Sequence, residues 1–190
     1  PEMDDWFPQE LAATDVVLAI SSKEDRYRGW VSEDGAEWIE LAGVSDLDEM
    51  VILSLVGIGE WFYAAGTERD QTGGRAVIYR SRDGEAWERV RGLGDGALSE
   101  ADGWVSDLAQ TANGLLAVGS ADGEQIAVWE SSDGAGWARV TTEGLPGKGT
   151  SVELLGISEQ GEALFAIAGE EHRLVTGSRV LTDAGLMRVA

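Results

Sequence analysis

Three stretches of this chain carry the same short pattern: WVSEDGAEWIEL from Trp30, YRSRDGEAWERV from Tyr79 and WESSDGAGWARV from Trp129. Each contains Ser-x-Asp-Gly-x-x-Trp. A degenerate fourth copy, RVLTDAGLMRVA, begins at Arg179, with Leu in place of Ser, Ala in place of Gly and Met in place of Trp. The aspartates of successive copies are 49, 50 and 50 residues apart. This near-constant spacing indicates four copies of one structural unit.

Apolar segments precede each copy at corresponding places. The nearer set is VVLAIS from Val16, WFYAAGT from Trp61, LLAVGS from Leu115 and LFAIAG from Leu164. The farther set lies around Trp6 and at 50–56, 104–109 and 152–157. These segments have strand composition and are too short for helices. Asp-Gly is a strong turn signal because glycine adopts a positive φ without steric cost. Each unit is therefore predicted to hold four antiparallel strands, with the Asp-Gly turn between the third and the fourth.

Four-stranded units repeated about every 50 residues are typical of β-propeller blades. The predicted fold is all-β, with four four-stranded antiparallel sheets forming a single propeller domain or a propeller fragment. The predicted blades are 1–43, 44–92, 93–144 and 145–190. A solenoid would have shorter or helical repeats, and a sandwich would not explain the constant period. Three arrangements stay open: a closed four-blade ring, two chains forming an eight-blade ring, and part of a larger propeller.

The repeated pattern resembles the Asp-box, or BNR repeat, of sialidase-like propellers. The usual pattern is Ser-x-Asp-x-Gly-x-x-Trp, and here it is one residue shorter between Asp and Gly. The resemblance implies a structural box in which Asp accepts backbone N–H groups, Gly is left-handed and Trp packs between blades. The implied box residues are Ser32, Asp34, Gly35, Trp38, Ser81, Asp83, Gly84, Trp87, Ser131, Asp133, Gly134 and Trp137.

The composition excludes several kinds of function. The formal net charge is -21, and such an acidic surface repels nucleic acid and anionic membranes. No apolar run approaches the roughly 20 residues of a membrane span. The chain has no Cys, which removes thiolate chemistry, and its only histidine is His172, which argues against histidine-based catalysis.

No catalytic residue is predicted from the sequence. The sialidase set of arginine cluster, Tyr-Glu pair and Asp cannot be placed, and Tyr27 lies in a charged segment without distinguishing context. A pair of carboxylates acting on a glycoside stays an alternative. Two acidic loops of the expected loop face are candidate ligand or Ca²⁺ sites, through Asp46, Asp48, Glu49, Asp95, Glu100 and Asp102. No resident cofactor is otherwise expected.

The sequence thus predicts a non-catalytic binding or scaffold propeller with a protein or carbohydrate ligand on its loop face. An extracellular or cell-envelope location suits its acidity, and twelve Arg against two Lys hint at a bacterial origin. The alternatives are a sialidase-like or other glycoside hydrolase and a purely structural array of blades. A homodimer that closes a larger ring is a further expectation.

Overall fold

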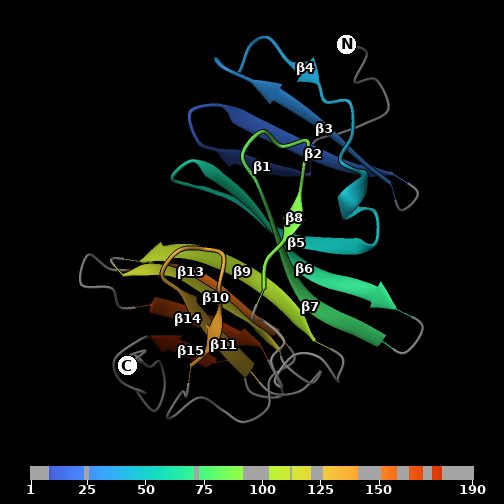
Figure 1. Cartoon of the computed structure of the whole chain (residues 1–190). Coiled ribbons are helices and arrows are strands. Elements are labelled where there is room, and N and C mark those ends of the chain that lie inside the picture. Colours follow the sequence, from blue (N-terminus) through green and yellow to red (C-terminus); the bar gives the residue numbers. More distant parts are fainter. Residues whose placement is uncertain are drawn as a thin grey trace.

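The structure is a computed structural model that describes residues 9–23, 26–70, 73–91, 103–111, 113–120, 126–140, 151–157, 163–168 and 173–176, the last three stretches as backbone only. The described chain is almost entirely β-strand. Figure 1 shows its four sheets following one another from the N-terminal to the C-terminal end. No helix among these residues is long and apolar enough to cross a membrane.

Each sheet is an antiparallel meander built from consecutive strands. The first sheet consists of β1 (Glu10–Ala13), β2 (Val17–Lys23), β3 (Arg26–Ser32) and β4 (Ile39–Glu40). The second consists of β5 (Met50–Ile58), β6 (Trp61–Asp70), β7 (Gly73–Ser81) and β8 (Glu88–Arg89). The third consists of β9 (Trp104–Thr111), β10 (Gly114–Ser120), β11 (Ile126–Ser131) and β12 (Ala138–Arg139). The fourth contains β13 (Ser151–Ile157), β14 (Ala163–Ala168) and β15 (Arg173–Thr176).

The first strands of successive sheets lie next to one another. Strand β1 contacts β5, β5 contacts β9, and β9 contacts β13. Gly57 of β5 permits the first of these approaches, because a side chain there would collide with the carbonyl group of Ala13. Innermost strands that meet in chain order, with each sheet running outward from them, define a β-propeller arrangement. The predicted all-β propeller fold is confirmed.

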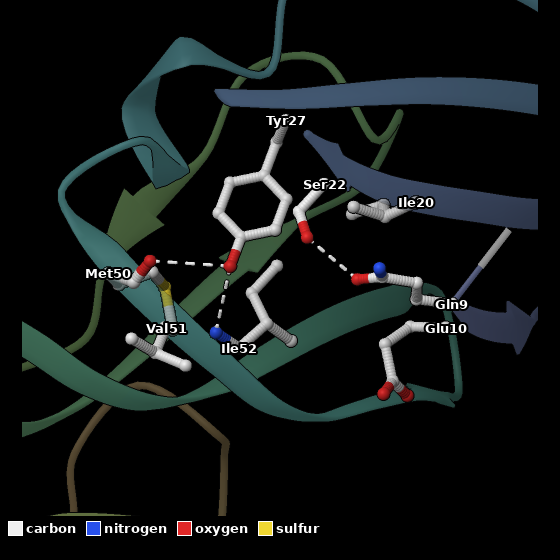
Figure 2. Close-up of a pocket in the computed structure, with 8 residues that line it drawn as sticks. All are labelled: Gln9, Glu10, Ile20, Ser22, Tyr27, Met50, Val51 and Ile52. Carbon is white, nitrogen blue, oxygen red and sulfur yellow. Dashed lines mark hydrogen bonds between the residues drawn. The ribbon is translucent and has the colours of Figure 1, made fainter. Parts of the chain in front are cut away.

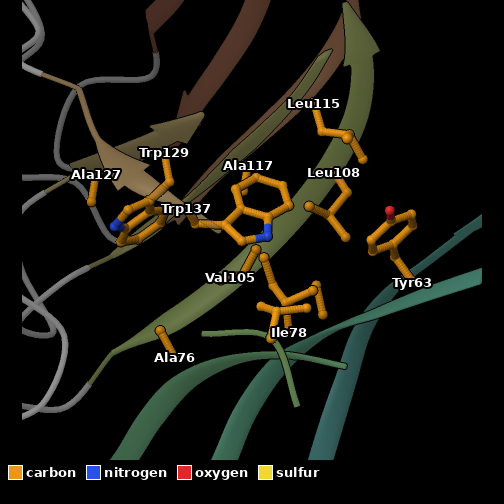
Figure 3. Packing of buried hydrophobic residues seen from close by; sticks show 12 residues of the cluster. Tyr63, Ala76, Ile78, Val105, Leu108, Leu115, Ala117, Ala127, Trp129 and Trp137 are labelled. Carbon is orange, nitrogen blue, oxygen red and sulfur yellow. The ribbon is translucent and has the colours of Figure 1, made fainter. Parts of the chain in front are cut away.

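Both faces of the middle sheet are buried, which explains its continuous apolar strands. In β6, Phe62 and Ala64 face the first sheet, whereas Tyr63 and Ala65 face the third, and all four are nearly inaccessible. Alternate residues of a strand point to opposite faces, so burial on both sides requires an unbroken apolar run. Figure 3 shows the layer between the second and third sheets, where Trp137, Val105 and Leu108 lie opposite Tyr63 and Ile78.

The structure also departs from the predicted strand pattern. The fourth sheet has three strands among the described residues, and the predicted outer strand with the degenerate turn lies outside them. The predicted strand around Trp6 is described only at Glu10–Ala13. The predicted loop after β4 contains a short 3-10 helix, η1 (Ser45–Leu47), which buries Leu47 between the first two sheets.

Candidate functional site

The repeated turns are closed by one set of hydrogen bonds. In the second sheet, one carboxylate oxygen of Asp83 accepts the backbone N–H groups of Glu85 and Ala86, at 2.9 and 3.0 Å. The Ser81 hydroxyl donates to the same oxygen at 2.9 Å and accepts the N–H of Gly84 at 2.9 Å. Gly84 has a φ of 79°, in the left-handed region. The Trp87 indole N–H then donates to the Gly84 carbonyl at 2.8 Å.

The turns of the first and third sheets repeat these bonds. Asp34 accepts two backbone N–H groups at 2.8 and 3.0 Å, and Asp133 accepts two at 2.9 and 3.0 Å. Trp38 and Trp137 donate to the carbonyls of Gly35 and Gly134. The two backbone hydrogen bonds lower the pKa of each of the three aspartates. Every predicted box residue therefore lies in the turn between the third and fourth strands of its sheet.

Two of the three turns dock on the preceding sheet. Trp87 is buried against the first sheet and Trp137 against the second. The Glu85 carboxylate accepts the N–H of Ala42 at 2.8 Å, and at the equivalent place in the third sheet the Ala135 carbonyl accepts the N–H of Arg91 at 3.1 Å. These contacts assign the turns a structural role at the joints between sheets.

A second group of polar residues lies on the innermost strands. Glu10 pairs with Ile20, Ser54 with Ala65 and Asp107 with Val118, so the three occupy equivalent positions of β1, β5 and β9. The register shifts beside Ser54 in β5 and beside Asp107 in β9, at β-bulges of the kind that re-aim side chains near functional sites. The Ser54 hydroxyl donates to the Asp107 carboxylate at 2.9 Å, linking the second sheet to the third.

A pocket of about 150 Å³ opens between the first two sheets beside this group (Figure 2). The Tyr27 side chain reaches from β3 to β5. Its hydroxyl group donates to the Met50 carbonyl at 3.3 Å and accepts the N–H of Ile52 at 3.1 Å. The remaining wall is formed by Gln9, Glu10, Ile20, Ser22 and Val51. These residues lie where β2 ends and β1, β3 and β5 begin, which places the pocket on the face that carries the loops between strands two and three.

The polar groups of the pocket are only partly satisfied within the protein. Ser22 donates to the Gln9 side-chain carbonyl at 2.7 Å. The half-buried carboxyl group of Glu10 has no hydrogen-bond partner among the described residues. Burial, and secondarily the negative charge of Asp107, raise the pKa of Glu10 above its ordinary value of 4.5. A carboxyl group accepts hydrogen bonds when ionised and also donates one when protonated, so in either form it can bond a hydroxylated ligand.

The predicted cation loop is not assembled in the part that the structure describes. Asp46 accepts the backbone N–H of Trp87 at 3.2 Å, and Asp48 accepts that of Tyr27 at 3.0 Å. Glu49 is exposed. No three acidic or histidine side chains of the described residues gather as a metal site. Asp46 and Asp48 thus hold the connection between the first two sheets in place. Asp95, Glu100 and Asp102 lie outside the described residues.

Trp61, which lies outside the repeated turns, contacts two arginines through the face of its ring. The guanidinium carbons of Arg80 and Arg82 lie 4.2 and 4.5 Å from the centre of its ring. Glu88 pairs with Arg80 at 2.6 Å. This cluster lies at the turn end of the second sheet, because Trp61 begins β6 and Arg80 is near the end of β7. Trp61 is thereby placed away from the pocket.

Sequence reasoning missed the pocket residues. The charged segment around Tyr27 gives no sign that this residue lies in β3 and bonds the second sheet. Glu10 and Asp107 lie next to apolar residues, and neither stands out within its own segment. A usable signal was present: alignment of the units shows a polar residue at one equivalent position of three otherwise apolar innermost strands.

Comparisons with known proteins support the fold and nothing narrower. No protein-family model and no curated protein matches the chain. A protein described as a "putative glycosidase" from Bacteroides thetaiotaomicron has a TM-score of 0.54 at 13% identity, over 90% of this chain and 67% of that one. The GH32 beta-fructofuranosidase of Bombyx mori, in a complex of a mutant with sucrose, has a TM-score of 0.50 at 12% identity, over 89% and 44%. The chain spans less than half of the fructofuranosidase. At such identities the likeness establishes the class, a β-propeller.

Proposed function

We propose that this protein is a non-catalytic binding propeller that holds one residue of a neutral carbohydrate in the pocket between its first two sheets. The observation that carries the proposal is the Glu10 carboxyl group, half-buried in a pocket of the loop face and without a partner among the described residues. The Glu10 side chain is partly exposed at the pocket wall, so its carboxyl group is open to a hydroxyl group of a ligand.

The size of the pocket and the charge of the protein limit which ligands can bind. A pocket of about 150 Å³ is smaller than the roughly 300–1,000 Å³ sites that enclose drug-sized ligands, which favours a single sugar ring over a whole oligosaccharide. The net charge of -21 disfavours anionic sugars. Ile20, Met50 and Val51 supply an apolar wall, and Glu10 with Gln9 supplies the polar one. By the same charge argument, a location outside the cytoplasm is part of this proposal.

The test is calorimetric titration of the protein with a panel of neutral mono- and oligosaccharides. Glu10→Leu keeps the approximate size of the side chain and removes its hydrogen-bonding groups, and we expect it to weaken binding on the order of tenfold. Glu60→Leu is the matched control, because Glu60 is exposed in the turn that closes the opposite end of β5. Loss of binding in the control, or no binding to any sugar, would contradict the proposal.

A glycoside hydrolase is the second candidate, and a specific observation favours it. Glu10 and Asp107 are two inner-strand carboxylates close enough that the charge of Asp107 helps to raise the pKa of Glu10. Glycoside hydrolysis uses a pair of carboxyl groups of which the general acid has a raised pKa. On this reading Glu10 is the general acid. The fold likeness to proteins named as glycosidases agrees with it at the level of fold alone.

Turnover distinguishes the two candidates. The same saccharides are incubated with the protein, and released reducing sugar is measured. The hydrolase predicts release that both Glu10→Gln and Asp107→Asn abolish, and the asparagine keeps an oxygen to accept the Ser54 hydroxyl. Binding without release in the wild-type protein supports the binding propeller, and release that survives both substitutions rejects the carboxylate pair.

A further inference from the structure

Two of the four polar side chains that line the pocket donate their hydroxyl hydrogen within the protein. The Tyr27 hydroxyl donates to the Met50 carbonyl and also accepts a backbone N–H of β5. The Ser22 hydroxyl donates to the side-chain oxygen of Gln9 at 2.7 Å. Among the described residues, the groups of the wall that remain for a ligand are the side-chain N–H groups of Gln9 and the carboxyl group of Glu10.

The bond from Ser22 determines which end of the Gln9 carboxamide faces the pocket. A hydroxyl group that donates bonds the oxygen of a carboxamide, because the carboxamide nitrogen is itself a donor. With its oxygen turned to Ser22, the carboxamide presents its two N–H groups on its other side. The backbone N–H of Gln9 donates to the Ile20 carbonyl at 3.0 Å, which attaches this residue to β2. Gln9 is therefore anchored at both ends, and its side-chain N–H groups have a fixed direction.

Gln9 and Glu10 place a hydrogen-bond donor beside an acceptor. Adjacent residues within a strand point to opposite faces, but Gln9 precedes β1, and its side chain is held at the pocket by the bond from Ser22. Figure 2 shows the end groups of Gln9 and Glu10 on the side of the pocket across from Met50 and Val51. A ligand in the pocket therefore meets N–H groups from one residue and carboxyl oxygens from the next.

We propose that the pocket recognises a vicinal diol, which is a pair of hydroxyl groups on adjacent carbons of a sugar ring. One hydroxyl accepts a hydrogen bond from the Gln9 carboxamide, and its neighbour donates one to the Glu10 carboxyl group. Ser22 is a positioning residue, because it sets the direction of the carboxamide. The inference rests on the proposed binding of a carbohydrate at this pocket, and it adds which part of the sugar is bound.

The first experiment is calorimetric titration with the methyl glycosides of glucose, galactose and mannose, and with the singly deoxygenated analogues of the one that binds best. Removing a hydroxyl that pairs a protein group is expected to lower the affinity about tenfold. This loss is expected at two adjacent ring carbons only. A loss at any other set of carbons, or at none, overturns the inference and leaves carbohydrate binding in place. If none of the three methyl glycosides binds, the inference is overturned, whereas the oligosaccharide titration decides the proposed function separately.

Two variants identify which residue bonds which hydroxyl. Gln9→Met removes the carboxamide and keeps the approximate length of the side chain, so the loss on deoxygenation should disappear at one carbon of the pair and persist at the other. Glu10→Leu should give the reverse pattern, because two groups that bond one another have non-additive effects. Gln110→Met, the same change at an exposed position of β9, is the matched control and should keep both losses. If both losses persist in Gln9→Met, the inference is overturned.

The positioning role of Ser22 is tested with the same ligands. Ser22→Ala frees the carboxamide to turn its oxygen to the sugar, so deoxygenation at the carbon that faces Gln9 should then cost less than about threefold in affinity. Ser22→Thr keeps the hydroxyl group and should restore the full loss. A role in stability alone would leave these ratios unchanged, because each ratio compares two ligands on the same protein. A full tenfold loss in Ser22→Ala would overturn the positioning role.

Discussion

The turns at residues 32–38 and 81–87 contain the same hydrogen bonds but have different surroundings. Both have an aspartate that accepts two N–H groups, a left-handed glycine and an indole that bonds the glycine carbonyl. A side chain built at Gly84 of the second turn would contact Leu18 and Leu41 of the first sheet, whereas one built at Gly35 of the first turn has no neighbour within 4 Å among the residues that the structure describes. The turn is therefore formed by local sequence, and its burial is supplied by a neighbouring sheet.

This difference separates two contributions to stability. The aspartate and serine bonds act within the turn and are common to all three copies. The burial of the tryptophan and the close approach of the glycine occur at the second and third turns, each of which lies against the sheet before it. Substitutions that remove the local bonds should therefore lower the stability by similar amounts in all three turns. Substitutions that remove a contact between sheets should lower it by different amounts.

The largest expected disagreement is at the tryptophans. Trp87→Ala and Trp137→Ala each remove a buried indole from the layer between two sheets and should cost about 3–5 kcal/mol of unfolding free energy. Trp38→Ala, at a partly exposed position, should cost less, about 1–2 kcal/mol. Urea unfolding measures all three. Equal losses at Trp38 and Trp87 would show that the first turn is buried in solution.

The glycines should show a smaller but graded difference. Alanine at Gly35, with a φ of 75°, meets only the left-handed strain and should cost about 1 kcal/mol. At Gly84 the new methyl also lies 2.8 Å from Leu18, and the cost should rise to about 2–3 kcal/mol. At Gly134 it collides with the Tyr63 hydroxyl, so the loss should be at least as large as at Gly84. Thermal unfolding of the three variants gives the order, and a flat series would refute docking as its cause.

The aspartates should behave alike. Asp34→Ala, Asp83→Ala and Asp133→Ala remove the same two backbone bonds, and each should lower stability by less than half of the Trp87 loss. Because their pKa values are lowered below the ordinary 3.8, this stabilisation is present above that pH and is lost as the pH falls through the lowered values. Acid titration of stability is the measurement. A variant whose acid limb matched the wild type would show that its aspartate is not stabilised by the turn.

Much of the fold can be predicted from the sequence because the residues that form the repeat act through interactions with their near neighbours in the chain. Asp34 and Gly35 define a turn wherever the chain places them, and the unbroken apolar run of β6 encodes a strand buried on both faces. Their 50-residue period then fixes the number of sheets. The strand around Glu10 was also predictable, since its segment aligns with the one at Trp104.

The pocket was not predictable in the same way. Its walls come from β1, β2, β3 and β5, and the role of Tyr27 depends on where Met50 and Ile52 lie across the boundary between two sheets. The two loop aspartates show the same dependence on distant partners. Asp46 and Asp48 have the composition of a cation loop, and their carboxylates accept the backbone N–H groups of Trp87 and Tyr27. Non-local pairing of this kind has no signal within a single repeat.

The smallest expected effect is at the pocket. The pKa of its carboxyl group is raised, whereas the pKa values of the turn aspartates are lowered. The pKa of Glu10 is raised from 4.5, so the folded protein holds that proton more tightly than the unfolded chain does. Its contribution is full below the ordinary value and is lost as the pH rises through the raised one. Glu10→Gln removes the ionisable group and with it this loss of stability at higher pH. The variant should therefore have a higher melting temperature than the wild type at neutral pH and no such gain under acid conditions. A higher melting temperature that persisted in acid would assign the effect to packing. An unchanged melting temperature at neutral pH would mean that the Glu10 carboxylate is already solvated and that the pocket is open to water.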